Sequence, residues 1–229
     1  MLLCRASGFF VTIMKCLLGE KVNMSQIFDE AGNVIPVTLI SILPNTVIQV
    51  RTKENDGYCA VQLGAGEKKQ KNIAKPQIGH FKGLGNFCYV KEFRMKDVQR
   101  KKGTDAPADV PEDMKVGTII DASVFQEGDR VAVSSISKAK GFQGVVKRHG
   151  FHGAPASHGT KHAHRQPGSI GATWPQRVIK GMRMAGRMGG VRVSVRNAKV
   201  EKVDAENKIL ALRGAVPGRR GTLVEIRGD

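Results

Sequence analysis

Five of the six histidines in this 229-residue chain lie within sixteen residues of one another, so a metal or acid-base site is the first chemistry to consider. Zinc needs three or four ligands, and a hydrolytic site usually adds a carboxylate base. No Asp, Glu or Cys lies near these histidines, and cations such as Lys147 and Arg165 stand among them. The pattern therefore predicts no metal and no cofactor, with a metal-dependent hydrolase as the alternative. The five are His149, His152, His158, His162 and His164.

Other residue types show no catalytic pattern. Ser157 and Ser169 have histidines near them, but no carboxylate in the neighbourhood would orient a base. The Gly-x-Gly pairs at Gly64 and Gly83 lack the GxGxxG continuation, and no GxxxxGK[ST] motif occurs. We therefore expect a protein that is not an enzyme.

The four cysteines stand at positions 4, 16, 59 and 88, without any CxxC pair. Neither a zinc ribbon nor a disulfide framework is indicated. We expect reduced thiols that are buried or half-buried, which fits the interior of a cell.

Residues 130–200 contain no Asp and no Glu but hold fourteen Lys and Arg and the only tryptophan. The chain carries a formal charge of +17, whereas residues 1–129 are close to balance, with 17 basic and 15 acidic side chains. A local excess of positive charge is typical of a binding surface for a polyanion. RNA is the leading candidate.

Within this run, residues 141–190 hold eleven glycines and few large apolar residues. Such a segment cannot build a core, so it is either a loop or an extension that a partner orders. Trp174 has two open roles: it could stack on a splayed nucleotide, or pack locally on Ile170 or Val178.

The elements that position these residues read as short β-strands. Residues 34–42, 46–51 and 59–63 are rich in β-branched side chains and are predicted as hairpin strands of one antiparallel sheet. A short helix is expected after Pro76, and Lys96–Lys115 as a surface connection. Further strands are predicted over residues 116–120, 130–136, 191–196, 199–203, 209–212 and 222–227.

Short strands at close spacing predict a mostly β fold with little helix: a small antiparallel β-barrel domain with a long basic glycine-rich loop extension. Alternation of valine with arginine or serine over 191–196 predicts a half-buried strand with one basic face. We expect the barrel domain, with surface insertions, over residues 14–140 and 191–229, and the loop over 141–190. Residues 1–13 are an N-terminal extension, read either as an organellar leader or as sequence upstream of a natural start at Met14.

Several stretches with fixed spacings stand out in and around the acid-free run: Lys140–Arg148 (KGFQGVVKR), Ser157–Gly159, Pro167–Gly171, Met184–Gly186, Ile35–Thr38 and Gly214–Gly218. These stretches resemble the large-subunit ribosomal protein L-three family, of the bacterial or organellar type. The resemblance covers the chain from about Met14 to the end.

The resemblance implies a structural constituent of the large ribosomal subunit that binds rRNA and assists early subunit assembly. In this family a loop extends from the β-barrel toward the peptidyl transferase centre, and Trp174 would lie near its innermost end. The implied partners are large-subunit rRNA and neighbouring large-subunit ribosomal proteins, with no membrane and no small-molecule substrate. The implied location is the cytoplasmic ribosome, with the organellar ribosome second. The alternative is a free-standing basic nucleic-acid-binding architectural protein.

The predicted rRNA-binding residues are cations for phosphates, glycines that let backbone approach RNA, and rings that stack or hydrogen-bond. They are Lys138, Lys140, Gly141, Gly144, Lys147, Arg148, His149, His158, Lys161, His164, Arg165, Trp174, Arg177, Lys180, Arg183 and Arg187.

Overall fold

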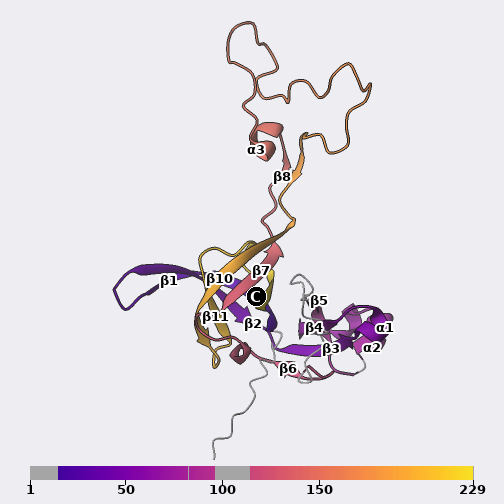
Figure 1. Cartoon of the computed structure of the whole chain (residues 1–229), viewed down its shortest axis with the longest axis vertical. Helices are drawn as coiled ribbons and strands as arrows, with labels where there is room; N and C mark the ends of the chain where they lie inside the picture. The colour runs from indigo at the N-terminus through magenta and orange to yellow at the C-terminus, as the bar shows by residue number, and fades with distance from the viewer. Residues whose placement is uncertain (1–14, 82, 96–113, 229) are drawn as a thin grey trace, which may run out of the picture. The chain divides into compact units, whose positions relative to one another are not determined.

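The computed structural model describes residues 15–81, 83–95 and 114–228. The chain divides into two compact units, one of Met1–Ser135 with Val193–Asp229 and one of Ile136–Arg192, and each is described by itself (Figure 1). The N-terminal extension and nearly all of the expected surface connection lie outside the described residues.

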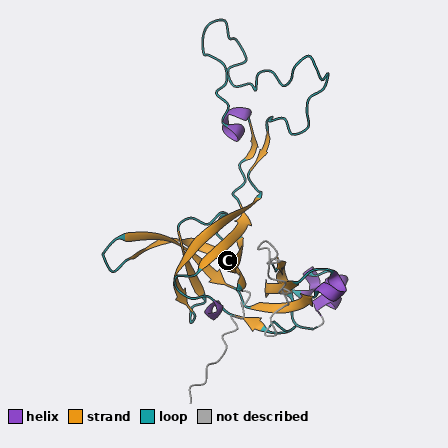
Figure 2. Ribbon diagram, in the orientation of Figure 1, coloured by secondary structure: helices purple, strands orange, loops and turns teal. Residues whose placement is uncertain are grey.

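The first unit contains a closed antiparallel barrel, which confirms the predicted fold class (Figure 2). Its strands follow the order β1 (Cys16–Phe28), β12 (Leu223–Gly228), β7 (Arg130–Ile136), β10 (Arg192–Asp204), β11 (Ile209–Arg213) and β2 (Val34–Ile42). The barrel closes because β1 pairs with both β2 and β12, and β11 joins β2 to β10.

A four-stranded antiparallel sheet accompanies the barrel in the same unit. The expected short helix forms close to the predicted place, as α2, and it packs Phe81 against Phe87 with ring centroids 5.3 Å apart. The sheet has the order β5 (Phe87–Arg94), β4 (Ala60–Glu67), β3 (Asn45–Arg51) and β6 (Ile119–Ile120). The helical turns of the unit are α1 (Lys53–Asp56), α2 (Lys75–Phe81) and the 3₁₀ turns Gln70–Asn72 and Ala122–Val124. No helix in the described part of the chain is long and apolar enough to cross a membrane.

The predicted grouping of residues 34–42 with 46–51 in one sheet is wrong. β2 belongs to the barrel, whereas β3 pairs with β4 and β6 in the other sheet. Between the strands stands Pro44, which has no amide hydrogen for a ladder. The buried Asn45 then anchors β3 to β1: its Oδ1 accepts the Leu18 amide at 2.9 Å, and its Nδ2 donates to the Leu18 carbonyl at 3.1 Å.

The two strands predicted over 191–203 form one continuous strand, β10. The half-buried face expected over 191–196 forms only in part: Val191 and Val193 are 59% and 38% exposed, Val195 is half-buried, and full burial begins at Ala198. Alternation records which side chains share a face, but it does not show whether a second layer covers that face.

The barrel and the four-stranded sheet share one hydrophobic core. Leu18 and Ile226 of the barrel cluster with Val61 and Leu63 of the sheet, and all four side chains are fully buried. Burial raises the pKa of the Cys16 thiol in this core from 9.0 to about 12, so Cys16 stays a neutral thiol.

The expectation of buried or half-buried thiols holds for two described cysteines and fails for a third. Cys16 is buried and Cys59 half-buried, but Cys88 is exposed. Cys88 lies on β5, a strand that sequence patterns did not predict.

Candidate nucleic-acid interface

The basic unit Ile136–Arg192 begins and ends in a short two-stranded hairpin. β8 (Gly141–Gln143) pairs with β9 (Gly186–Met188), and the Lys140 amide donates to the Met188 carbonyl at 2.9 Å. Gly189 follows with φ +73°, and a Cβ there would collide with the Lys138 carbonyl oxygen. Only glycine fits this backbone, which closes the hairpin at its base.

A single helical turn after β8 is fastened to the returning chain. Helix α3 (Val145–His149) ends at Gly150, which has φ +72°. The Arg148 guanidinium donates from Nη1 to the Met184 carbonyl at 2.6 Å, and His149 Nε2 lies 3.0 Å from the same oxygen. Because a carbonyl only accepts, His149 must carry its proton on Nε2. These two bonds form a clamp that joins α3 to residue 184.

A second set of contacts closes the segment between residues 153 and 164. The Ala154 amide donates to the His164 carbonyl at 3.0 Å, and His164 Nδ1 lies 3.2 Å from the Pro155 carbonyl. Gly153 has φ +78°, and a Cβ there would collide with the His164 carbonyl oxygen. The long loop in Figure 2 is therefore held by internal hydrogen bonds, although residues 150–185 contain no helix or strand.

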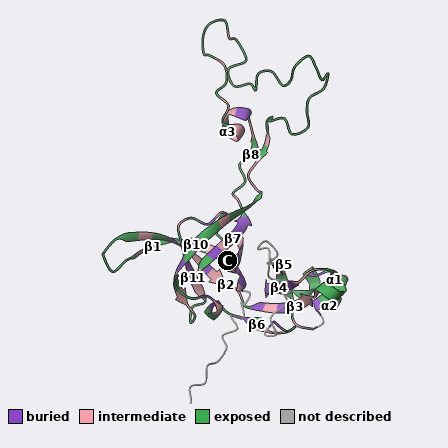
Figure 3. Cartoon of the chain, viewed as in Figure 1, coloured by how far each residue is buried: buried purple, intermediate pink, exposed green. Residues whose placement is uncertain are grey.

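Most of this unit is exposed, as the green trace in Figure 3 shows. Trp174 is 80% exposed, so neither Ile170 nor Val178 covers it, and the local-packing role has no support. All side chains from Lys161 to Ala185 are exposed. Because residues 130–200 contain no carboxylate side chain, the cations on this surface have no acidic neighbour within the unit.

The predicted site residues fall into two groups. Arg148 and His149 are half-buried and take part in the clamp on Met184, so they have a structural task in addition to any ligand. The others are exposed: Lys138, Lys140, Gly141, Gly144, Lys147, His158, Lys161, His164, Arg165, Trp174, Arg177, Lys180, Arg183 and Arg187.

Two aromatic residues of this unit were missing from the predicted site. Phe142 is 77% exposed and faces Arg187 across the β8–β9 ladder. Phe151 lies beside His149, with ring centroids 6.0 Å apart, and the Arg183 guanidinium lies 5.8 Å from its centroid. Aromatic residues interleaved with cations are the signal that would have found them.

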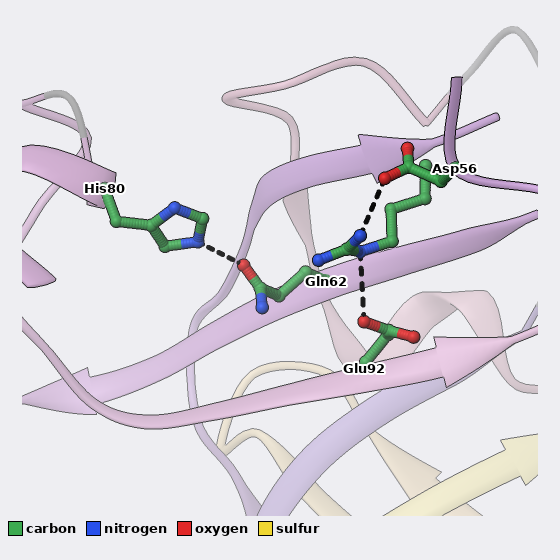
Figure 4. Close-up of polar contacts among 5 residues, drawn as sticks. Asp56, Gln62, His80 and Glu92 are labelled. Carbon is green, nitrogen blue, oxygen red and sulfur yellow. Dashed lines mark hydrogen bonds and ion pairs between the residues drawn. The ribbon is translucent and has the colours of Figure 1, made fainter.

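The histidines of the basic unit are close in sequence, but the structure does not gather three of them at one point. Among the residues that the structure describes, no group of three or more His, Cys, Asp or Glu side chains could hold a metal ion. The sixth histidine, His80, is part of the other unit and lies 2.6 Å from Gln62 through Nε2 and Oε1 (Figure 4).

Charge is balanced differently in the four-stranded sheet. Arg51 lies between two carboxylates, 2.7 Å from Asp56 and 3.2 Å from Glu92 (Figure 4). The Arg94 guanidinium stacks on Tyr58 at 4.0 Å. Arg51 and Arg94 therefore have partners within the protein, whereas the exposed cations from Lys161 to Lys180 have no acidic side chain in their own unit.

Comparison with known proteins points to the same family in every case. The model of the family described as "Ribosomal protein L3" matches residues 48–211. The chain is 48% identical over 217 residues to "Large ribosomal subunit protein uL3" of Acidothermus cellulolyticus, covering 93% of this chain and 92% of that protein. Proteins of the same name from Pelotomaculum thermopropionicum and Herpetosiphon aurantiacus are 45% and 46% identical, covering 93% and 92% of this chain and 96% and 94% of theirs.

Proposed function

Since the chain belongs to the ribosomal protein L3 family, we propose that it is a structural, non-enzymatic constituent of the large ribosomal subunit whose unit Ile136–Arg192 binds rRNA. One observation carries the proposal: a long run of exposed cations, free of acidic side chains, lies on a backbone that internal hydrogen bonds hold together. Phosphate oxygens are the ligands that such a surface fits.

The cations and the rings have different tasks in this proposal. Exposed cations such as Lys161, Lys180 and Arg183 neutralise phosphates and release counterions. Trp174, with most of its surface free, stacks on an unpaired base. His164 keeps one ring nitrogen for the Pro155 carbonyl and offers the other to RNA.

The clamps present the binding surface. Arg148 and His149 hold residue 184 beside α3, so the outgoing and the returning segments of the loop leave the β8–β9 hairpin in a defined arrangement. A preorganised backbone loses less conformational entropy when it enters a folded RNA. We place the loop between rRNA helices, directed toward the peptidyl transferase centre, and the binding early in subunit assembly.

Sucrose-gradient fractionation of native cells that express a tagged chain tests the proposal. We expect the chain to remain in the large-subunit fractions through a high-salt wash, because many phosphate contacts share the binding. A chain found only in the free pool or on DNA would contradict the proposal and support the free-standing architectural protein. Replacing Lys161, Lys180 and Arg183 by Gln should lower retention in the same gradients.

A matched triple variant controls for loss of charge. Lys53, Lys69 and Lys71 are exposed residues of the other unit, so replacing them by Gln removes the same charge outside Ile136–Arg192. Equal loss of retention from both triple variants would argue against an rRNA surface confined to the basic unit.

A further inference from the structure

The outer part of the β1–β2 hairpin forms a two-stranded arm. β12 pairs with β1 only over Cys16–Glu20, and β11 pairs with β2 only over Val37–Ser41. In these ladders residues 26–28 pair only with 34–36, and Met24 and Ser25 pair with Thr38 and Val37 at the base; Figure 1 shows this part of β1 running beyond the other barrel strands. We call residues 22–36 the arm.

One face of the arm is exposed and, apart from Gln26, apolar. Met24, Gln26 and Phe28 alternate along β1, and their register partners on β2 are Thr38, Pro36 and Val34. Side chains at alternate positions and their cross-strand partners share a face. On this face Met24, Phe28 and Val34 are 51%, 66% and 55% exposed.

Backbone hydrogen bonds close the tip of the arm. The Asp29 amide donates to the Asn33 carbonyl at 2.9 Å, and the Gly32 amide donates to the Asp29 carbonyl at 2.8 Å. A two-stranded ribbon is only marginally stable in water by itself. An apolar ribbon face of this kind gains stability when a partner covers it.

Charge distinguishes between the possible partners. Residues 22–50 contain no Lys and no Arg, although the chain has 37, and the only acidic side chains among them are Asp29 and Glu30 at the tip of the arm. The arm itself therefore offers RNA phosphate no cation, and the carboxylates of its tip would repel phosphate. Apolar side chains beside Lys or Arg on another protein would complement the arm.

We infer that the arm is a docking surface for a neighbouring protein of the large subunit, one that lays apolar side chains on Met24, Phe28 and Val34 and pairs a Lys or Arg with Asp29 or Glu30. The inference rests on the proposed function, because that function requires the chain to be part of the assembled subunit. The arm and the basic unit then divide the contacts of the chain between protein and RNA.

Site-specific photo-crosslinking tests the docking surface. A photoreactive diazirine analogue of phenylalanine replaces Phe28 in the full chain, and intact large subunits are purified and irradiated. We expect a crosslink to one other ribosomal protein, on a peptide that contains Lys or Arg. The same analogue at Trp174 provides the contrast and should crosslink to rRNA.

Several results would overturn the inference while leaving the proposed function intact. They are a Phe28 crosslink to rRNA, to residues 1–14 or 96–113 of the same chain or to a second copy of it, and no crosslink in subunits that do contain the chain. A chain absent from the large-subunit fractions would instead overturn the proposed function, and this inference with it.

Charge reversal at the tip tests the chemistry of the partner. Asp29→Lys with Glu30→Lys should lower the Phe28 crosslink yield about tenfold, equivalent to about 1.4 kcal/mol. Glu54→Lys with Glu67→Lys makes the same change of charge at exposed positions off the arm and should leave the yield unchanged. If the tip variant crosslinks as well as the control, a basic partner is excluded.

Discussion

At the scale of single residues, Asn45 links the two sheets of the first unit. Its fully buried side chain bonds both backbone groups of Leu18 and also donates to the carbonyl of the half-buried Leu43 at 2.6 Å. Buried backbone groups that lose their partners keep the cost of desolvation. A single amide thus determines how β3 leaves the barrel.

Replacing Asn45 by Ala should lower the free energy of unfolding by about 2 to 3 kcal/mol, since it removes the side-chain partners of the Leu18 amide and the Leu43 carbonyl, while the Leu18 carbonyl keeps the Leu43 amide at 3.3 Å. Urea denaturation followed by circular dichroism measures the change. Asn72→Ala, at an exposed position, should stay within about 0.5 kcal/mol of the unsubstituted chain. Similar losses in both variants would show that the Asn45 bonds carry little stability.

The cysteines provide a second test at this scale. Burial raises the pKa of Cys16 to about 12, so the thiolate is scarce below that pH in the folded chain. In the unfolded chain the thiol ionises near 9.0, so this group's contribution to stability is present below pH 9 and falls as the pH rises toward 12.

In a Cys4→Ser chain at pH 8, a thiol reagent should therefore modify the exposed Cys88 quickly and Cys16 only after denaturant is added. Mass spectrometry of tryptic peptides identifies the modified positions. Rapid modification of Cys16 without denaturant would mean that the barrel opens readily around β1.

At the scale of elements, the base of the basic unit depends on backbone that only glycine can adopt. Gly189 combines φ +73° with close approach to the Lys138 carbonyl, next to the hydrogen bond from the Lys140 amide to Met188. The β8–β9 hairpin is short, so the loss of one bond affects the whole element.

Gly189→Ala should speed hydrogen exchange at the Lys140 amide about tenfold, because strain of this kind costs of the order of 1 to 3 kcal/mol. Gly171→Ala is the matched control: its backbone is not left-handed, and a Cβ there meets nothing within 4 Å. NMR exchange rates measure both. Unchanged exchange in the Gly189 variant would show that the hairpin tolerates a shifted turn.

At the scale of the whole molecule, charge is divided along the chain. Residues 130–200 hold fourteen cations and no carboxylate, while residues 22–50 hold no cation. In the four-stranded sheet Arg51 lies beside Asp56 and Glu92, so its charge is already compensated. The electrostatic attraction to a polyanion therefore originates in one segment of the chain.

The dependence of RNA affinity on salt measures this division. Replacing Lys161, Lys180 and Arg183 by Gln should reduce the slope of log K against log salt by about 2 to 3, at roughly 0.7 to 0.9 per lost phosphate contact. The variant with Gln at Lys53, Lys69 and Lys71 should keep the original slope. Filter binding to a large-subunit rRNA fragment over a salt series measures both, and equal slopes for the two variants would refute a localised site.

Much of this protein could be predicted from local patterns in the sequence. Strands 130–136 and 209–212 were found because β-branched and apolar residues recur there between turn residues, and a barrel followed from their spacing. The acid-free run indicated the candidate interface, because charged residues can be counted in the sequence without knowledge of the fold. β1 and β5 were not predicted: charged and polar residues interrupt β1 from Glu20 onward, whereas β5 does carry strand-forming residues in Phe87, Tyr89 and Val90.

By itself the sequence determined the fold class, the family resemblance and the segment that carries the positive charge, because composition and spacing are local properties of the chain. Only the tertiary structure decided that β2 and β3 belong to different sheets, that Arg148 and His149 clamp residue 184, and that the arm exposes an apolar face. Each of these depends on which distant backbone groups meet. Pairing between such groups is set by the closure of the whole barrel and by the burial of its core, not by any short stretch of residues.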